Sequence, residues 1–287
     1  MVDNKLIDRL IERCLYEDMG NGDITTNSVV PKDGKTKGVI HAKQAGVIAG
    51  LAVAERVFRF LSTDISFVTK VEDGEKVQAG TILAEVEGDA KAILTGERVA
   101  LNFLQRMSGI ATRTSLLVDK IKEYPVRVVD TRKTTPGLRL LEKYAVFIGG
   151  GHNHRFGLYD AVMIKDNHIK VAGGITQAVA AVRKTVSHMM KIEVEVEDLA
   201  GVTEALHAKV DVIMLDNMDN KTMRQAVEMI GNLALIEASG GINEQTIVQV
   251  AQTGVNIISV GGLTHSVQSL DISLDIGEIK VGIKEVR

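Results

Sequence analysis

The sequence predicts an α/β protein in which a β/α barrel follows an N-terminal α+β unit. From Val126 onward, short apolar segments alternate with amphipathic helical segments, which is typical of a parallel sheet covered by helices. Residues 1–105 lack this rhythm. The sequence shows no glycine-rich dinucleotide fingerprint between a first strand and a first helix, so a barrel is favoured over an open doubly wound sheet.

The N-terminal unit is expected to combine a leading helix, several strands and a long helix that begins near Gly96. Apolar residues at helical spacing predict the leading helix, and they place Cys14, the single cysteine, in the core. GVIHAK, ISFVTKV and TILAEVEG are strand-like. The segment 267–287 alternates apolar and polar residues like an edge strand, and we expect it to return to this unit.

Six apolar segments between residues 106 and 266 are expected to be the strands of the barrel. They are VRVV at 126, AVMI at 161, IEVEV at 192, VIML at 212, ALIEA at 234 and IISV at 257. Amphipathic stretches such as EDLAGVTEALHAK follow them, which predicts the covering helices.

The composition excludes several classes of protein. A net charge of −3, a pI of about 6.2 and the absence of Trp disfavour a nucleic-acid binder. One cysteine allows no disulfide framework and disfavours redox and zinc chemistry. The first residues are charged, and the sequence has no apolar run of the roughly 18 residues that a membrane span needs, so we expect a cytoplasmic protein without membrane partners.

A polar residue or a glycine follows each predicted barrel strand, at the end where the reacting groups of such barrels lie. These residues are Asp130, Arg132 and Lys133 after the first strand, Lys165, Glu195 and Asp216 at the next three, and Ser239, Gly240, Gly241, Gly261 and Gly262 at the last two. Taken alone, Asp216 is equally well explained as a helix N-cap.

The alternating carboxylates of IEVEVE are harder to explain as surface residues. Glu193, Glu195 and Glu197 are expected to point to one face of a strand that is buried on both faces. Buried carboxylates need lysines, a metal or polar substrate groups as partners. A structural ion-pair network remains the alternative.

Glycine pairs end the last two strands, in ASGG and VGGLTHS. Glycine lets backbone N–H groups approach an anion, and the final two loops of a barrel often bind phosphate. A single Gly-Gly is usually a turn, but two on adjacent strands favour a phosphate pocket.

Basic residues gather at the same expected mouth. They are Arg132, Lys133, His154, Arg155 and Lys165. Arginine suits carboxylates and phosphates, which indicates a polyanionic ligand. A solvated basic loop would not need the three glycines of GGGHNHRFG. His152 and His154 lack a nearby third imidazole or thiol in the sequence, so oxygen-bound Mg²⁺ at Glu195 and Asp216 is the favoured metal.

The motifs DTRKTTPGLRLLEKYAV, GGGHNHRFGLYDAVMIKDNH, EVEVE, IMLDN, ASGG and VGGLTHS together resemble those of quinolinate phosphoribosyltransferase, also called carboxylating nicotinate-nucleotide pyrophosphorylase. The resemblance covers essentially the whole chain. It implies an α+β sandwich domain over residues 1–105, an incomplete β/α barrel over residues 106–266, and a homodimer with shared active sites, with a hexamer left open. The implied reaction joins quinolinate to phosphoribosyl pyrophosphate and releases pyrophosphate and CO₂, giving nicotinate mononucleotide for NAD synthesis.

The resemblance also implies roles for individual residues. It places Arg132, His154, Arg155 and Lys165, with Arg98 from the neighbouring subunit, around the two quinolinate carboxylates. It assigns Lys133 to the pyrophosphate side, Glu195 and Asp216 to the ribose hydroxyls and Mg²⁺, and Ser239, Gly240, Gly241, Val260, Gly261 and Gly262 to the 5-phosphate region. Thr131 is a further substrate-binding residue, and Lys133, Glu195 and Asp216 are the implied catalytic residues. Mg²⁺ is the implied cofactor.

Two other functions remain as alternatives. A paralogous phosphoribosyltransferase, such as the molybdenum-operon relative, would take another heteroaromatic acid, but four cations at the ring site suit the dianion quinolinate. A non-catalytic carrier or binding module is suggested only by residues 71–88, which resemble half of a biotinyl or lipoyl domain but lack its modified lysine tip.

Overall fold

The computed structural model describes residues 4–277; residues 278–287, the end of the expected returning tail, lie outside the described residues. The chain forms two compact units. The first takes the residues up to Arg113, Pro136–Gly150 and the segment from Val267, and the second takes Thr114–Thr135 and Gly151–Ser266. The segment 136–150 therefore groups with the first unit. The expected division into residues 1–105 and 106–266 places this segment in the barrel.

The first unit is built on an antiparallel sheet of four strands in the order β12-β1-β5-β3. Its strands are β1 (Lys35–Ala42), β3 (Ile65–Thr69), β5 (Ile82–Asp89) and β12 (Ile272–Ile276). Residues at the end of the described chain thus pair with β1, in the register Ile40 to Leu274. A short ladder joins β2 (Gly46–Val47) to β4 (Lys76–Val77).

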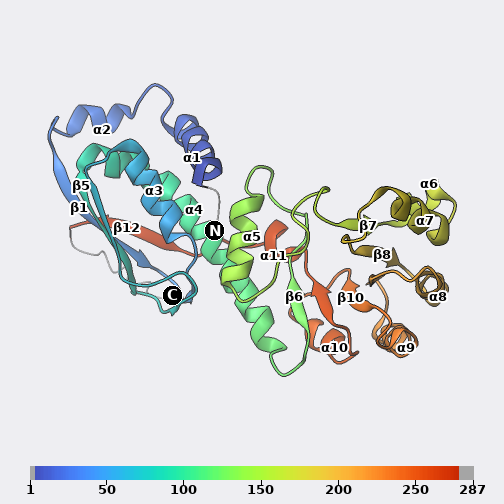
Figure 1. Ribbon diagram of the computed structural model, residues 1–287. Helices are drawn as coiled ribbons and strands as arrows, with labels where there is room; N and C mark the ends of the chain where they lie inside the picture. The colour runs from blue at the N-terminus through green and yellow to red at the C-terminus, as the bar shows by residue number, and fades with distance from the viewer. Residues whose placement is uncertain (1–3, 278–287) are drawn as a thin grey trace. The chain divides into compact units, whose positions relative to one another are not determined.

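Figure 1 shows α3 and the first part of α4 beside this sheet. The helices of the unit are α1 (Asn4–Met19), α2 (Ile24–Val29), α3 (Leu51–Leu61), the first part of α4 (Ala90–Lys120) and α5 (Arg139–Ile148). Phe58 of α3 is fully buried and stacks on Phe67 of β3, with ring centroids 6.2 Å apart. Cys14 is half-buried, and burial raises the pKa of its thiol.

The long helix α4 starts at Ala90, so the expectation that it begins near Gly96 is wrong. Asp89, the last residue of β5, accepts hydrogen bonds from the backbone N–H groups of Lys91 and Ala92. A side chain that satisfies free N–H groups of the first turn allows the helix to begin directly after the strand.

The second unit is a parallel sheet of six strands in the order β6-β11-β10-β9-β8-β7. The strands are β6 (Arg127–Val129), β7 (Val162–Ile164), β8 (Ile192–Val196), β9 (Val212–Asp216), β10 (Leu235–Ser239) and β11 (Ile257–Ser259). All six lie in the segments predicted from the sequence. A single parallel bridge from Val129 to His152 extends the sheet beyond β6. Within residues 4–277 no ladder joins β6 to β7, so the β/α barrel is incomplete, as expected.

The helices of this unit connect consecutive strands, and Figure 1 shows α8, α9 and α10 on the same side of them. They are α6 (Asp166–Ala172), α7 (Ile175–Thr185), α8 (Leu199–His207), α9 (Asn220–Ile230), α10 (Ile247–Ala251) and α11 (Gly262–His265). The apolar core residues Ile213, Leu215, Ala205 and Ala226 are fully buried. None of the helices in the described part of the chain is long and apolar enough to cross a membrane.

Candidate active site

A cavity of about 550 Å³ opens at the carboxyl ends of the barrel strands. Eleven residues predicted from the sequence line it: Thr131, Arg132, Lys133, His154, Arg155, Lys165, Glu195, Asp216, Ser239, Gly240 and Gly241. Met163, Met214, Asn217, Glu237 and Ser259 also line it. Residues expected at five separate strand ends, with His154 and Arg155, are therefore gathered around one cavity.

Strand alternation explains which side chains reach this cavity. Side chains two residues apart on a strand point to the same face. Met214 and Asp216 of β9 both line the cavity, and so do Glu237 and Ser239 of β10. Ile213 and Leu215, between and beside them, are fully buried on the other face. The alternation of side chains along each strand thus places the site residues on one face and the apolar core residues on the other.

The charges follow the order of the strands around the mouth. Cationic residues follow β6 and β7, the two outer strands of the sheet. Serine and glycines follow β10, and the carboxylates Glu195 and Asp216 end the neighbouring strands β8 and β9. The cavity therefore has a carboxylate region between a glycine loop and a cationic region.

Lys165 and Glu195 form an ion pair at this mouth. The side chain of Glu195 is 12% exposed and that of Lys165 is 43% exposed, so the carboxylate is the more deeply placed partner. In the sequence these residues were assigned to different substrates. The structure brings their charged groups into contact.

Asp216 is not a helix cap. Its Oδ2 accepts a hydrogen bond of 2.7 Å from Nδ2 of Asn217. The cap of α9 is Asp219, which accepts from the N–H groups of Lys221 and Thr222 at 2.8 and 2.9 Å. The N-cap interpretation of Asp216 is therefore wrong, and its carboxylate is available to the cavity.

The loop after β10 needs glycine for geometric reasons. Gly240 has φ +94°, and a Cβ there would lie 2.1 Å from Oδ1 of Asn217. Asn217 itself has φ +55°, so the two residues form a tight backbone crossing. This brings the backbone of the loop to the wall of the cavity, where its N–H groups can meet an anion.

Val260, Gly261 and Gly262, predicted with the phosphate residues, do not line the cavity directly. Gly261 lies against Lys133, because a Cβ on Gly261 would be 3.0 Å from Cδ of that lysine. Oγ1 of Thr264 donates to the carbonyl oxygen of Lys133 at 2.7 Å. The loop after β11 therefore supports the position of Lys133.

Arg132 and Arg155 place two guanidinium groups close together. Burial lowers the pKa of Arg155, and the positive charge of Arg132 lowers it further. Nη1 of Arg155 donates to the carbonyl oxygen of Ala161 at 3.1 Å. Like charges held together in a cavity favour the binding of an anion between or beside them.

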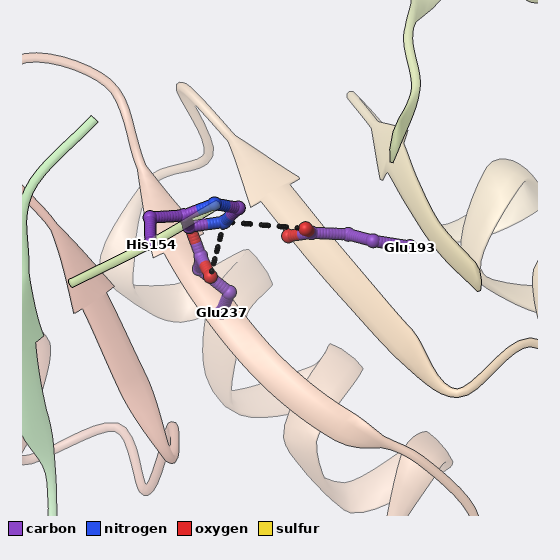
Figure 2. A group of neighbouring side chains, drawn as sticks. All are labelled: His154, Glu193 and Glu237. Atoms are coloured by element: carbon purple, nitrogen blue, oxygen red, sulfur yellow. Dashed lines mark ion pairs between the residues drawn. The ribbon is translucent and has the colours of Figure 1, made fainter. Parts of the chain in front are cut away.

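His154 is held by two buried glutamates from different strands (Figure 2). Its Nε2 lies 3.2 Å from Oε2 of Glu193 on β8 and 3.4 Å from Oε2 of Glu237 on β10. Burial alone would lower the pKa of His154, but the hydrogen bonds and charges of the two glutamates raise it to about 10. Burial also raises the pKa of Glu193.

The other contacts of His154 fix its backbone and its second ring nitrogen. Oδ1 of the fully buried Asp130 accepts from the His154 N–H at 2.9 Å. The Arg155 N–H donates to Nδ1 at 2.8 Å, which favours an unprotonated Nδ1, whereas the two glutamates favour a charged ring. Two anions at hydrogen-bonding distance outweigh one neutral N–H, so we take the ring as charged at neutral pH.

His154, Glu193 and Glu237 are also a possible set of metal ligands, since one ligand atom of each lies within 4.8 Å of the others. The sequence did not reveal Glu237, although it alternates with Ser239 in ALIEAS and so shares its face. Of the three glutamates expected on one face of β8, Glu197 lies beyond the end of the strand and is exposed. The other two point to the site.

Arg98 lies on α4 in the first unit, where its side chain is exposed. The structure contains one chain, and the role expected for Arg98 in a neighbouring subunit stays a prediction.

Comparison with known families matches both units of the chain. The family model described as "Quinolinate phosphoribosyl transferase, C-terminal domain" matches residues 110–275, and the corresponding N-terminal domain matches residues 23–108. The chain is 45% identical to a probable nicotinate-nucleotide pyrophosphorylase [carboxylating] of Bacillus subtilis, over 93% of this chain and 92% of that protein. It is 46% identical to the protein of the same name in Synechocystis, over 94% and 92%.

A solved structure shows the same architecture. The crystal structure of NadC from Streptococcus pyogenes superposes with a TM-score of 0.92, at 42% identity, over 97% of this chain and 99% of that chain. The agreement extends over both units and over the six-stranded parallel sheet.

Proposed function

The chain belongs to the quinolinate phosphoribosyl transferase family, and from this premise we propose that it transfers the phosphoribosyl group of phosphoribosyl pyrophosphate to quinolinate. The products are nicotinate mononucleotide, pyrophosphate and CO₂. The observation that supports this most is the order of charges around the cavity, with carboxylates between a glycine loop and a cationic region. That order matches the order of groups in the two substrates.

The cationic region suits the two carboxylates of quinolinate. Arg132, Arg155 and Lys165 line the cavity, and the first two repel each other until an anion binds. Guanidinium groups bind carboxylates through two parallel hydrogen bonds. A heteroaromatic acid with one carboxylate would leave part of this positive charge unmatched, which argues against the paralogous function.

The carboxylate region suits the ribose. Glu195 and Asp216 end adjacent strands and present oxygen ligands, which are the donors that Mg²⁺ prefers. Two carboxylates are too few for an all-protein Mg²⁺ cage, so the residues fit an ion that is shared with substrate oxygens and water. When bound, Mg²⁺ would neutralise charge on the pyrophosphate. Mg²⁺ as cofactor is part of this proposal.

The glycine loop and Lys133 suit the phosphate groups. The backbone of Ser239, Gly240 and Gly241 lines the cavity beside Asp216 and can accept the 5-phosphate. Lys133 is exposed at the mouth and is supported by Gly261, so it can reach the departing pyrophosphate.

The proposed chemistry separates opposite charges. As pyrophosphate leaves, positive charge builds on the anomeric carbon, where Glu195 and Asp216 stabilise it, while Lys133 stabilises the leaving group. The ring nitrogen of quinolinate bonds to that carbon and becomes a pyridinium. The adjacent carboxylate then leaves as CO₂, its electron pair is stabilised by the cationic ring, and a proton replaces it.

We also propose a homodimer in which Arg98, which is exposed on α4, enters the partner's active site, as the family resemblance implies. Whether dimers assemble into a hexamer is left open. The cytoplasmic location expected from the sequence stays a prediction.

The test is to incubate the protein with quinolinate, phosphoribosyl pyrophosphate and Mg²⁺ and to measure all three products. Equal amounts of nicotinate mononucleotide, pyrophosphate and CO₂ are expected. Nicotinate in place of quinolinate, and removal of Mg²⁺ by a chelator, should each stop the reaction. Product from nicotinate but none from quinolinate would support the paralogous function, and full activity without divalent metal would contradict the role given to Mg²⁺.

A further inference from the structure

Two buried carboxylates approach one ring nitrogen of His154, which lines the cavity (Figure 2). The side chains of Glu193 and Glu237 are 9% and 2% exposed, and both approach Nε2 of His154 through Oε2. Their second oxygens, Oε1, are buried without a hydrogen-bond partner in the described part of the chain. Burying two carboxylates with two unsatisfied oxygens is unfavourable for stability, so the arrangement needs an explanation in function.

The two glutamates reach the ring from either side of an intervening strand. Glu193 is on β8 and Glu237 is on β10, with β9 between them in the sheet. Asp130 holds the backbone of His154 from the end of β6. Three strands thus fix one ring, whereas a histidine that only fills space in a core needs a single partner.

Glu237 differs from Glu193 in one respect. Glu237 lines the cavity together with His154, and Glu193 is not among the lining residues. Glu237 is therefore placed where it controls which way the ring faces the ligand. Nothing in the ordered motifs of the sequence pointed to this residue.

We propose that Glu237 is a positioning residue that, together with Glu193, fixes the ring of His154 against the quinolinate site. The inference rests on the proposed function, because it assigns the fixed ring to the binding of a substrate carboxylate. Glu237 does not touch the reacting atoms; it acts through His154. Its loss should weaken quinolinate binding and leave the phosphoribosyl pyrophosphate site unaffected.

The ring itself gives a second readout. Glu193 and Glu237 both approach Nε2 of His154. Removing the carboxylate of Glu237 takes away one of these two contacts, so the ring nitrogen signals of His154 should change in the free protein.

The experiment compares Glu237→Gln, which keeps the shape and removes the charge, with Glu237→Asp, which keeps the charge. We expect Glu237→Gln to raise KM for quinolinate about tenfold with KM for phosphoribosyl pyrophosphate unchanged, and Glu237→Asp to recover part of the loss. NMR of the histidine ring nitrogens, without substrates, should show a changed Nε2 signal of His154 in Glu237→Gln and a smaller change in Glu237→Asp.

Glu142→Gln is the matched control. Glu142 is 1% exposed and paired with Arg106 in the first unit, so its loss tests the removal of a buried glutamate outside the cavity. If Glu142→Gln changed KM for quinolinate as much as Glu237→Gln, or if Glu237→Gln raised both KM values alike, the positioning role would be overturned. Should Glu237→Gln fail to fold, Glu237→Asp decides: a rise in KM for quinolinate alone supports the positioning role, and unchanged KM values with an unchanged Nε2 signal of His154 overturn it.

Two further outcomes separate this inference from its rivals. Zn²⁺ or Mn²⁺ that raised the Tm of the wild type but not of Glu237→Gln would show a metal site and overturn the positioning role. A wild type that does not use quinolinate would contradict the proposed function, whereas an unchanged KM for quinolinate and an unchanged Nε2 signal of His154 in Glu237→Gln would contradict this inference alone.

Discussion

Lys165 and Glu195, which follow the neighbouring strands β7 and β8, are ion-paired at the mouth of the barrel. Each side chain therefore balances the charge of the other before any ligand binds. A substrate carboxylate that approaches Lys165 must share it with Glu195, and an approaching metal ion must share Glu195 with Lys165. The pair couples the two halves of the cavity.

Replacing Lys165 should separate the two substrates. We expect Lys165→Ala to raise KM for quinolinate about 30-fold, near 2 kcal/mol, because the lysine is partly exposed and the value lies at the low end for a lost charge partner. KM for phosphoribosyl pyrophosphate should change much less. Lys170→Ala, which breaks an exposed pair with Asp166, is the control and should leave both constants unchanged. Equal weakening of both substrates would place Lys165 elsewhere.

Asp216 and Asp219 are close in sequence but should respond oppositely to mutation. Asp216→Asn is expected to lower kcat about 100-fold, with little change in KM, because its carboxylate meets charge that develops in the transition state. Asp219→Asn should keep kcat and change the stability of α9 only slightly, because Asn is also a favourable N-cap residue. Steady-state kinetics of both variants measure kcat and KM, and urea unfolding measures their stability. A near-normal kcat in Asp216→Asn would show that Asp216 has no catalytic role.

Gly240→Ala tests the close backbone approach after β10. The positive φ and the predicted collision with Asn217 should cost about 1–3 kcal/mol of stability. KM for phosphoribosyl pyrophosphate should rise more than KM for quinolinate. Gly231→Ala provides the comparison, since Gly231 also has positive φ but a Cβ there meets nothing within 4 Å. If both variants behaved alike in kinetics, backbone strain alone would account for the result.

The His154 cluster should make stability depend on pH. Because the folded pKa is raised from 6.5 to about 10, the charged ring stabilises the fold fully below pH 6.5, and this stabilisation is lost as pH rises through about 10. The free energy of unfolding of the wild type should therefore fall more between pH 6.5 and 10 than that of His154→Gln. Urea unfolding across this range measures the difference, and parallel curves for the two proteins would contradict it.

Mixing two inactive variants tests the shared active site. Arg98→Ala and Lys165→Ala are expected to be nearly inactive alone at low quinolinate. In a mixed dimer one site combines an intact barrel with an intact Arg98 from the other subunit. Random pairing in equal amounts should restore about a quarter of the wild-type sites. No rescue, with subunit exchange verified by mass spectrometry, would show that Arg98 does not serve a neighbouring site.

The barrel was predictable from the sequence because its signals are local. Each strand is a short apolar segment that ends in a polar residue or glycine, so the six strands and the expected fold class are confirmed. The start of α4 was predicted wrongly because Asp89 ends a strand and caps a helix at the same place. Because Asp89 has both roles, no loop residues separate β5 from α4, and the sequence does not mark where the helix begins.

The floor of the site was not predictable in the same way. Glu193 and Glu237 meet at His154 only because β8 and β10 lie on either side of β9, and strand order is a long-range property. Glu237 also lies within an apolar segment, without a glycine or a cation beside it. The residues at the rim were found because polar residues at strand ends share one position in every barrel.

The division of the chain bears on how the protein is made. The first unit is assembled from three stretches of chain, and the chain passes from one unit to the other four times. Its sheet has β12 as an edge strand beside β1, so a nascent chain on the ribosome carries β1 with one side unpaired until all the barrel residues have been synthesised. An unpaired strand edge can join another chain, so we expect the open edge of β1 to favour aggregation during this interval.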